Sequence, residues 1–299
     1  VSTTHSIVGS MIGFGIMAGG FSVIKWSMLV AIVMSWVISP VFSLIIAYVI
    51  FKLIVKIILS KNDPFEWSLK LSPFFIGITF FVVISSFLFK TPLGKKLAIG
   101  TPSALLIAFI LAVVLGFAGM LALKRFVKNK KNGAEGIFRS IQVGTSCYVA
   151  LAQGANDVAN AIGPLAVIYF IVKTGGIGVM VPVPVFLLLF GGIGIAFGIS
   201  MAGARVMETV GKKITTLTNT RGFSVEFAAA TTVLVASKMG LPVSTTHAAV
   251  GGVLGVGLAR GFEAVNFRII IKIMLYWVLT VPISAITSMI IFKILQLIL

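Results

Sequence analysis

The chain has 299 residues, of which 59% are hydrophobic and 10% are charged, and its mean hydropathy is +1.15. A soluble domain is about 45–50% apolar and about 25% charged, so this composition excludes an ordinary soluble protein and indicates a polytopic membrane protein. The net charge is +17, and the single cysteine, Cys147, excludes an internal disulfide and a cysteine-based metal cluster.

Apolar segments long enough to cross a bilayer recur along the chain, and most of the basic residues flank them. Helices of about 20 apolar residues span the hydrocarbon core and satisfy their own backbone there, so we predict an all-α fold. Basic residues at the ends of such segments act as interface anchors, so we expect no nucleic-acid partner. In chain order, the predicted segments are 1–20, 26–59 with a kink at Pro40, 71–89, 102–123, 140–173, 184–201, 222–261 and 267–299.

Residues 124–139, KRFVKNKKNGAEGIFR, form the most basic stretch of the chain. Loops rich in Lys and Arg favour the cytoplasmic side of a membrane, so we predict a solvated cytoplasmic connector here. Residues 1–123 would then hold the remainder of a first repeat unit with its adjoining spans, and residues 140–299 would form a second unit.

The pentapeptide VSTTH occurs at both 1–5 and 243–247, and the match continues beyond it. The matched pairs are Gly9 with Gly251, Gly13 with Gly255, Gly15 with Gly257, Gly19 with Gly261 and, after a one-residue slip, Trp36 with Trp277. Such internal repeats are typical of secondary transporters. The second unit also carries GANDVANA at 154–161, so we expect that residue 1 is an internal cut and that an N-terminal segment holds the partner motif.

Each VSTTH segment has the features of a helix start, with Pro242 directly before the second copy. A helix N-terminus offers free N–H groups and a positive dipole end, and adjacent hydroxyls add further donors for an anion. The alternative is plain N-capping with packing by small residues, but two copies in matched repeats favour an anion site. For His5 and His247, a hydrogen bond from a neutral imidazole to the backbone of the hairpin is favoured over a ligand or proton-relay role.

Asp157 lies in the apolar stretch QGANDVANAIGP, and no Lys or Arg occurs within ten residues of it. A charge at mid-bilayer costs roughly 2.5–3.5 kcal/mol, so this carboxylate needs a partner. Asn156 and Asn160 add amide oxygens, a ligand type that suits a hard cation such as Na⁺. The flanking glycines allow irregular backbone, and Pro164 is expected to end the helix. The alternative is an Asp–Asn hydrogen bond that joins helices.

Glu226 is the other acid with apolar neighbours. Ionic coupling or gating is one interpretation, and an ion pair with Arg221 at the membrane edge is the other, with equal weight. The remaining acids are interpreted as surface residues: Asp63, Glu66, Glu135, Glu208 and Glu263.

At GANDVANA (154–161), PVSTTH (242–247) and STTH (2–5), the sequence resembles the PiT family of sodium- or proton-coupled inorganic phosphate transporters. The resemblance covers nearly all of the chain. It implies a prokaryotic-type, multi-pass protein of the plasma membrane, built as an inverted-repeat transporter with broken helices and re-entrant helical hairpins. The implied phosphate contacts are Ser2, Thr3, Thr4, Asn156, Ser244, Thr245 and Thr246; the implied sodium ligands are Asp157 and Asn160; Glu226 matches a membrane-embedded acid with a coupling or gating role.

The function expected from these observations is sodium-coupled uptake of inorganic phosphate by alternating access, with Na⁺ as the co-transported ion. Expected partners are phosphate, the lipid bilayer and the N-terminal segment, and a homodimer is compatible with the resemblance. The same residues leave open a proton-coupled phosphate permease or a sulfate permease. A channel fits a buried acid and broken helices poorly. An intramembrane enzyme is disfavoured because HExxH is absent and no second acid lies near Asp157.

Overall fold

The structure is a computed structural model that describes residues 2–90, 100–127, 133–176, 181–239 and 243–298. Its main elements are α1 (Thr3–Gly19), α2 (Trp26–Ile54), α3 (Pro64–Lys90), α5 (Thr101–Phe126), α6 (Gly133–Thr174), α7 (Val185–Glu208), α8 (Asn219–Lys238), α9 (Thr245–Arg260) and α10 (Phe267–Ile298). Short π-helical turns extend α2 (Val55–Leu59) and α7 (Thr209–Ile214). Six helices of the described part are long and apolar enough to cross a membrane, which confirms the all-α polytopic fold.

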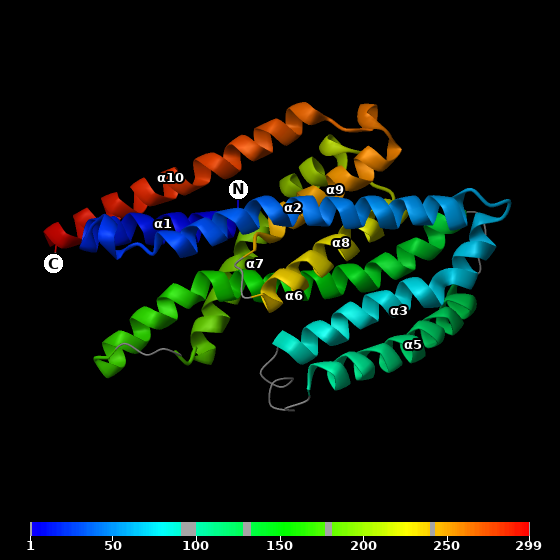
Figure 1. The fold of residues 1–299 in the computed structure, drawn as a ribbon, viewed down its shortest axis with the longest axis horizontal. Coiled ribbons are helices and arrows are strands. Elements are labelled where there is room, and N and C mark those ends of the chain that lie inside the picture. The colour runs from blue at the N-terminus through cyan, green and yellow to red at the C-terminus, as the bar shows by residue number, and fades with distance from the viewer. Residues whose placement is uncertain (1, 91–99, 128–132, 177–180, 240–242, 299) are drawn as a thin grey trace.

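The inverted repeat consists of two helix pairs, α1 with α2 and α9 with α10, and the two pairs run in opposite directions. Helix α1 starts near the middle of the molecule and runs to one end, where the chain turns back into α2 (Figure 1). Helix α9 also starts near the middle, but it runs to the opposite end before the chain turns back into α10 (Figure 1). The short helix of each unit packs along the long helix of the other unit, α1 on α10 and α9 on α2. The two units are therefore exchanged rather than folded separately.

Matched glycines allow this exchange, because they let the short helices approach the long ones backbone to backbone. A Cβ added at any of four glycines would collide with a backbone carbonyl of the facing helix. In matched order, these approaches join Gly9 to Val281, Gly13 to Ala285, Gly251 to Pro40 and Gly255 to Leu44. Small residues at helix interfaces are the usual means of close packing in membranes, and here the repeat places them symmetrically.

Gly255→Ala is expected to destabilise the protein, because the new methyl group would collide with the Leu44 carbonyl oxygen. Overpacking of this kind costs about 1–3 kcal/mol, so the melting temperature in detergent should fall by several degrees. Gly13→Ala, at the matched position, should behave alike. Gly15→Ala is the control, because nothing lies within 4 Å of its added Cβ. A melting temperature of Gly255→Ala at or above that of Gly15→Ala would contradict this account.

The basic connector predicted at 124–139 is shorter in the structure. Helix α5 continues to Phe126 and α6 begins at Gly133, so Lys124, Arg125 and Arg139 all lie in helices. Residues 128–132 lie outside the described part. Long basic side chains extend readily from helix ends toward water, which explains why a charged stretch did not mark the helix boundaries.

Helix α6 runs without interruption through the GANDVANA stretch, so the predicted helix end at Pro164 is wrong. Pro164 lacks the N–H that would bond to the carbonyl of Asn160, four residues earlier, but the helix continues to Thr174. The same holds in α2, where Pro40 cannot donate a backbone hydrogen bond to the Trp36 carbonyl and the helix nevertheless continues to Ile54. Both prolines therefore remove the usual helical donor of one backbone carbonyl without ending the helix.

Candidate functional site

The N-termini of α1 and α9 meet in the interior. Ser2 and Ser244 cap these helices, since their hydroxyls accept hydrogen bonds from the N–H groups of His5 (3.4 Å) and His247 (3.3 Å). The two serine Oγ atoms lie 2.9 Å apart, and both side chains are fully buried. The two hydroxyl-rich segments, almost a whole chain apart in sequence, thus form one polar centre, which we call the tip site.

Asp157 of α6 joins the two helix tips. Thr3 Oγ1 and Thr245 Oγ1 both donate to Asp157 Oδ1, each at 3.4 Å. One carboxylate oxygen therefore receives a hydroxyl from each repeat unit. The Asp157 side chain is partly buried, so part of its surface remains accessible.

The two asparagines of the motif lie at the same place. Asn160 Nδ2 donates to Thr4 Oγ1 at 3.3 Å, and the Thr4 hydroxyl donates in turn to the Val243 carbonyl at 3.4 Å. Asn156 Nδ2 is buried without a hydrogen-bond partner. Unpaired buried donors are uncommon and costly, so this amide marks a position where a bound oxygen would be favourable.

The remaining residues of the two predicted motifs are Thr246, Val1 and Pro242. Thr246 follows Thr245 in the first turn of α9 and is partly buried. Val1, directly before the first Ser-Thr-Thr sequence, and Pro242, two residues before the second, lie outside the described part of the chain.

The histidines anchor each tip to the long helix of the opposite unit. His247 Nδ1 hydrogen-bonds the Trp36 carbonyl at 3.0 Å, and His5 Nδ1 hydrogen-bonds the Trp277 carbonyl at 2.9 Å. The Trp36 carbonyl is the one that Pro40 leaves without a helical donor, so the histidine supplies the missing bond. The sequence favoured a backbone hydrogen bond within the hairpin; in both repeats the bond instead reaches the long helix of the other unit.

The four rings of these residues form a buried cluster directly behind the tips. His5 lies against Trp36 in a tilted arrangement with ring centroids 3.8 Å apart, His247 stacks on Trp277 at 3.6 Å, and the two imidazoles lie 4.6 Å apart. Both imidazole Nε2 atoms and both indole Nε1 atoms are buried without a partner. The cluster fixes how each short helix crosses its long partner, and so sets the separation of the tips.

Glu226 lies in a second polar cluster, between α8 and α6. Its carboxylate accepts hydrogen bonds from Thr145 Oγ1 (2.6 Å), Ser146 Oγ (2.6 Å) and Gln142 Nε2 (3.3 Å). Arg221 donates instead to the Thr216 carbonyl at 2.8 Å, so the predicted alternative of a Glu226–Arg221 ion pair is wrong.

The three partners of Glu226 were missed in the sequence. Their spacing of three and four residues puts Gln142, Thr145 and Ser146 on one face of α6. This pattern points to a site only when the acid that faces it, Glu226, is already known. Ser146 lies eleven residues before Asp157 on the same helix, or about 16 Å along its axis at ~1.5 Å per residue. Glu226 is therefore separate from the tip site but shares α6 with it.

The chemistry available at the tip site is that of oxygen ligands and hydroxyl or amide donors. Within the described ranges, no group of three or more His, Cys, Asp or Glu residues could hold a metal ion. The site therefore suits a weakly held hard cation and an oxyanion rather than a tightly bound transition metal.

The chain is similar to known proteins along most or all of its length. The model of the phosphate transporter family matches residues 1–288. A Thermococcus kodakarensis protein named "Putative phosphate permease TK2061" is 48% identical over 303 residues, which cover 100% of this chain and 73% of that protein. The "Inorganic phosphate transporter 2-1, chloroplastic" of Arabidopsis thaliana is 38% identical, over 95% of this chain and 53% of its own length. A solved structure titled "The sodium-dependent phosphate transporter" matches with a TM-score of 0.89 and 45% identity, over 100% of this chain and 74% of that one.

Proposed function

The chain belongs to the phosphate transporter family, and from that premise we propose that it imports inorganic phosphate together with Na⁺ across the plasma membrane by alternating access. The family and the structural neighbour are transporters rather than enzymes. The observation that carries the proposal is the tip site, where Asp157 receives a hydroxyl from each of two opposed helix N-termini.

The phosphate would bind between the two tips. The first N–H groups of a helix have no partner within the helix, and each serine cap satisfies only one of them. The remaining N–H groups and the nearby hydroxyls are donors of the kind that oxyanions accept. The proposed phosphate contacts are Ser2, Thr3, Thr4, Asn156, Ser244, Thr245 and Thr246.

The Na⁺ ion would bind beside the carboxylate of Asp157 and the amide oxygen of Asn160. The Asn160 backbone carbonyl, which cannot receive a bond from Pro164, is a further oxygen at this place. Carboxylate, amide and carbonyl oxygens are the ligands that hard cations prefer. In this proposal α6 would offer that carbonyl oxygen without the irregular backbone expected from the sequence.

A charge balance explains why the two solutes would bind together. Each helix N-terminus carries roughly +0.5 of an elementary charge, so two tips offset about the single negative charge of Asp157. A phosphate dianion would then meet a site of almost no net charge. Na⁺ bound at Asp157 makes the site positive, and each solute thereby favours the other by a coupling free energy of typically about 1–3 kcal/mol.

Radiolabelled phosphate uptake into vesicles tests this proposal. Uptake should saturate with phosphate, rise with the Na⁺ gradient and stop without it. Competition by sulfate tests for a sulfate permease, which is needed because the hydroxyl donors of the tips suit either oxyanion. A pH series at fixed Na⁺ tests for proton coupling. An uptake rate that does not depend on the Na⁺ gradient but rises with the proton gradient would overturn the proposed sodium coupling.

The double variant Ser244→Ala/Thr245→Val is expected to weaken phosphate binding at fixed Na⁺. It removes two hydroxyls from one tip, and hydrogen bonds to charged groups contribute about 1.5–3 kcal/mol each, so affinity should fall by about tenfold or more. Isothermal titration with phosphate measures this. Ser224→Ala is the control, since that buried hydroxyl donates to the Thr220 carbonyl within α8. Unchanged phosphate affinity in the double variant would leave this segment with a capping role alone.

A further inference from the structure

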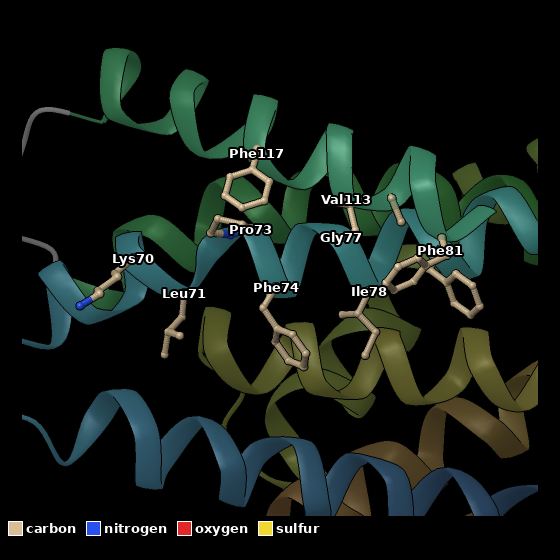
Figure 2. Close-up of a pocket in the computed structure, with 11 residues that line it drawn as sticks. Lys70, Leu71, Pro73, Phe74, Gly77, Ile78, Phe81, Val113 and Phe117 are labelled. Carbon is tan, nitrogen blue, oxygen red and sulfur yellow. The ribbon is translucent and has the colours of Figure 1, made fainter. Parts of the chain in front are cut away.

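An apolar groove lies between α3 and α5, on a part of the molecule that the proposed transport does not use (Figure 2). Its volume is about 650 Å³, within the roughly 300–1,000 Å³ of ligand pockets. Phenylalanines line it along both helices, among them Phe74, Phe81, Phe109 and Phe117. Gly77 contributes no side chain, and a Cβ there would lie 3.2 Å from the Ala112 carbonyl oxygen, so the two helices approach closely beneath the groove.

The groove has the length of one membrane leaflet. On α3 it extends from Lys70 to Phe81, eleven residues or about 16 Å at ~1.5 Å per residue. The hydrocarbon core of a bilayer is about 30 Å thick, so one leaflet contributes about half of that. A groove of this length accommodates an extended acyl chain from one side of the membrane.

One end of the groove is basic and the rest is apolar. Lys70 is its single charged lining residue, and its side chain points toward the start of α3 (Figure 2). The Nζ atoms of Lys61 and Lys70 each lie 5.2 Å from the ring centre of Trp67, an arrangement typical of the membrane interface.

The surrounding charges at this end are also mainly positive. Helix α5 runs antiparallel to α3, so the last turn of α5, with Lys124 and Arg125, ends beside the start of α3 (Figure 1). The acids at this end are engaged in hydrogen bonds or lie beside them: Asp63 accepts the Glu66 N–H at 3.0 Å, and Glu135, in the first turn of α6, accepts from two threonine hydroxyls. A headgroup at this position would meet an excess of cations.

We propose that the groove between α3 and α5 binds an anionic phospholipid, with one acyl chain along the phenylalanines and the phosphate beside Lys61 and Lys70. The apolar lining selects a hydrocarbon chain, the length selects a single leaflet, and the basic end selects a negatively charged headgroup. Each interfacial lysine favours an anionic over a neutral lipid by about fivefold, which corresponds to about 1 kcal/mol.

Native mass spectrometry of the full chain in detergent tests this, with phosphatidylglycerol and phosphatidylcholine of identical acyl chains as the probes. The wild type should retain one phosphatidylglycerol more tightly than phosphatidylcholine. Lys61→Gln/Lys70→Gln should remove about fivefold of that preference per lysine, whereas Lys272→Gln, an exposed lysine of α10, should keep it.

A second pair of variants tests the acyl-chain part of the groove. Val113→Trp fills the groove and should weaken retention of both lipids by about tenfold, the loss expected when a fitted apolar contact is excluded. Val114→Trp, on the adjacent and more exposed position of α5, should bind as the wild type does. Equal retention by the two tryptophan variants would overturn the proposal. A wild-type dimer that only Val113→Trp dissociates, without retained lipid, would assign the groove to a second copy and overturn it as well.

Discussion

Asp157→Asn is expected to abolish sodium-dependent phosphate uptake while the protein still inserts and folds. Asparagine keeps the size of the side chain and one oxygen for Thr3 and Thr245, but it removes the charge that would hold Na⁺. By the charge balance above, the neutral asparagine leaves the two positive helix ends without their counter-charge, so phosphate no longer needs Na⁺ to bind and its transport is uncoupled from the Na⁺ gradient. Losing both a charged cation ligand and the coupling it supports corresponds to about a hundredfold or more in uptake.

The control for this variant is Asp63→Asn, which makes the same substitution at an aspartate outside the tip site, where Asp63 accepts a backbone N–H at the start of α3. Asparagine caps a helix about as well as aspartate, so Asp63→Asn should leave both the melting temperature and the uptake per folded protein close to those of the wild type. Uptake should be measured over a Na⁺ titration in vesicles. Wild-type uptake by Asp157→Asn at every Na⁺ concentration would remove Asp157 from the cation site.

The repeat was readable in the sequence, but its exchanged packing was not. Matching glycines and tryptophans paired the units residue by residue, yet spacing along a chain says nothing about which helix faces which. The exchange follows from backbone contacts, where Gly251 meets Pro40 and Gly9 meets Val281 across units. Such contacts depend on long-range geometry, and only coordinates reveal them.

Proline was the residue most easily misjudged from the sequence. Pro164 was expected to end a helix, because proline cannot donate the usual backbone bond. In the structure the freed carbonyl is tolerated, and at Trp36 a histidine from the other unit satisfies it. A local rule therefore failed at the places where a distant side chain or a proposed ligand supplies the missing partner, which is where functional sites commonly lie.

Glu226→Gln is expected to reduce sodium-driven uptake by at least about tenfold while phosphate binding at the tip site changes little, within about threefold. Glu226 holds α8, which leads into the second tip, against α6, which carries Asp157. Its two hydroxyl contacts at 2.6 Å are charge-assisted, and a neutral amide weakens both. Movement of one helix against the other would change these bonds, so we place the effect on the transport step rather than on binding.

A matched acid separates this role from simple stabilisation. Glu135 also joins α6 to α8, since its carboxylate accepts from Thr218 Oγ1 at 2.9 Å and from Thr220 Oγ1 at 2.6 Å. Glu135→Gln should lower the melting temperature as Glu226→Gln does, because each removes a charged acceptor from two hydroxyls. Only Glu226→Gln should separate phosphate binding from sodium-driven uptake. Equal effects of both variants on uptake per folded protein would show that Glu226 only stabilises the packing of α8 on α6.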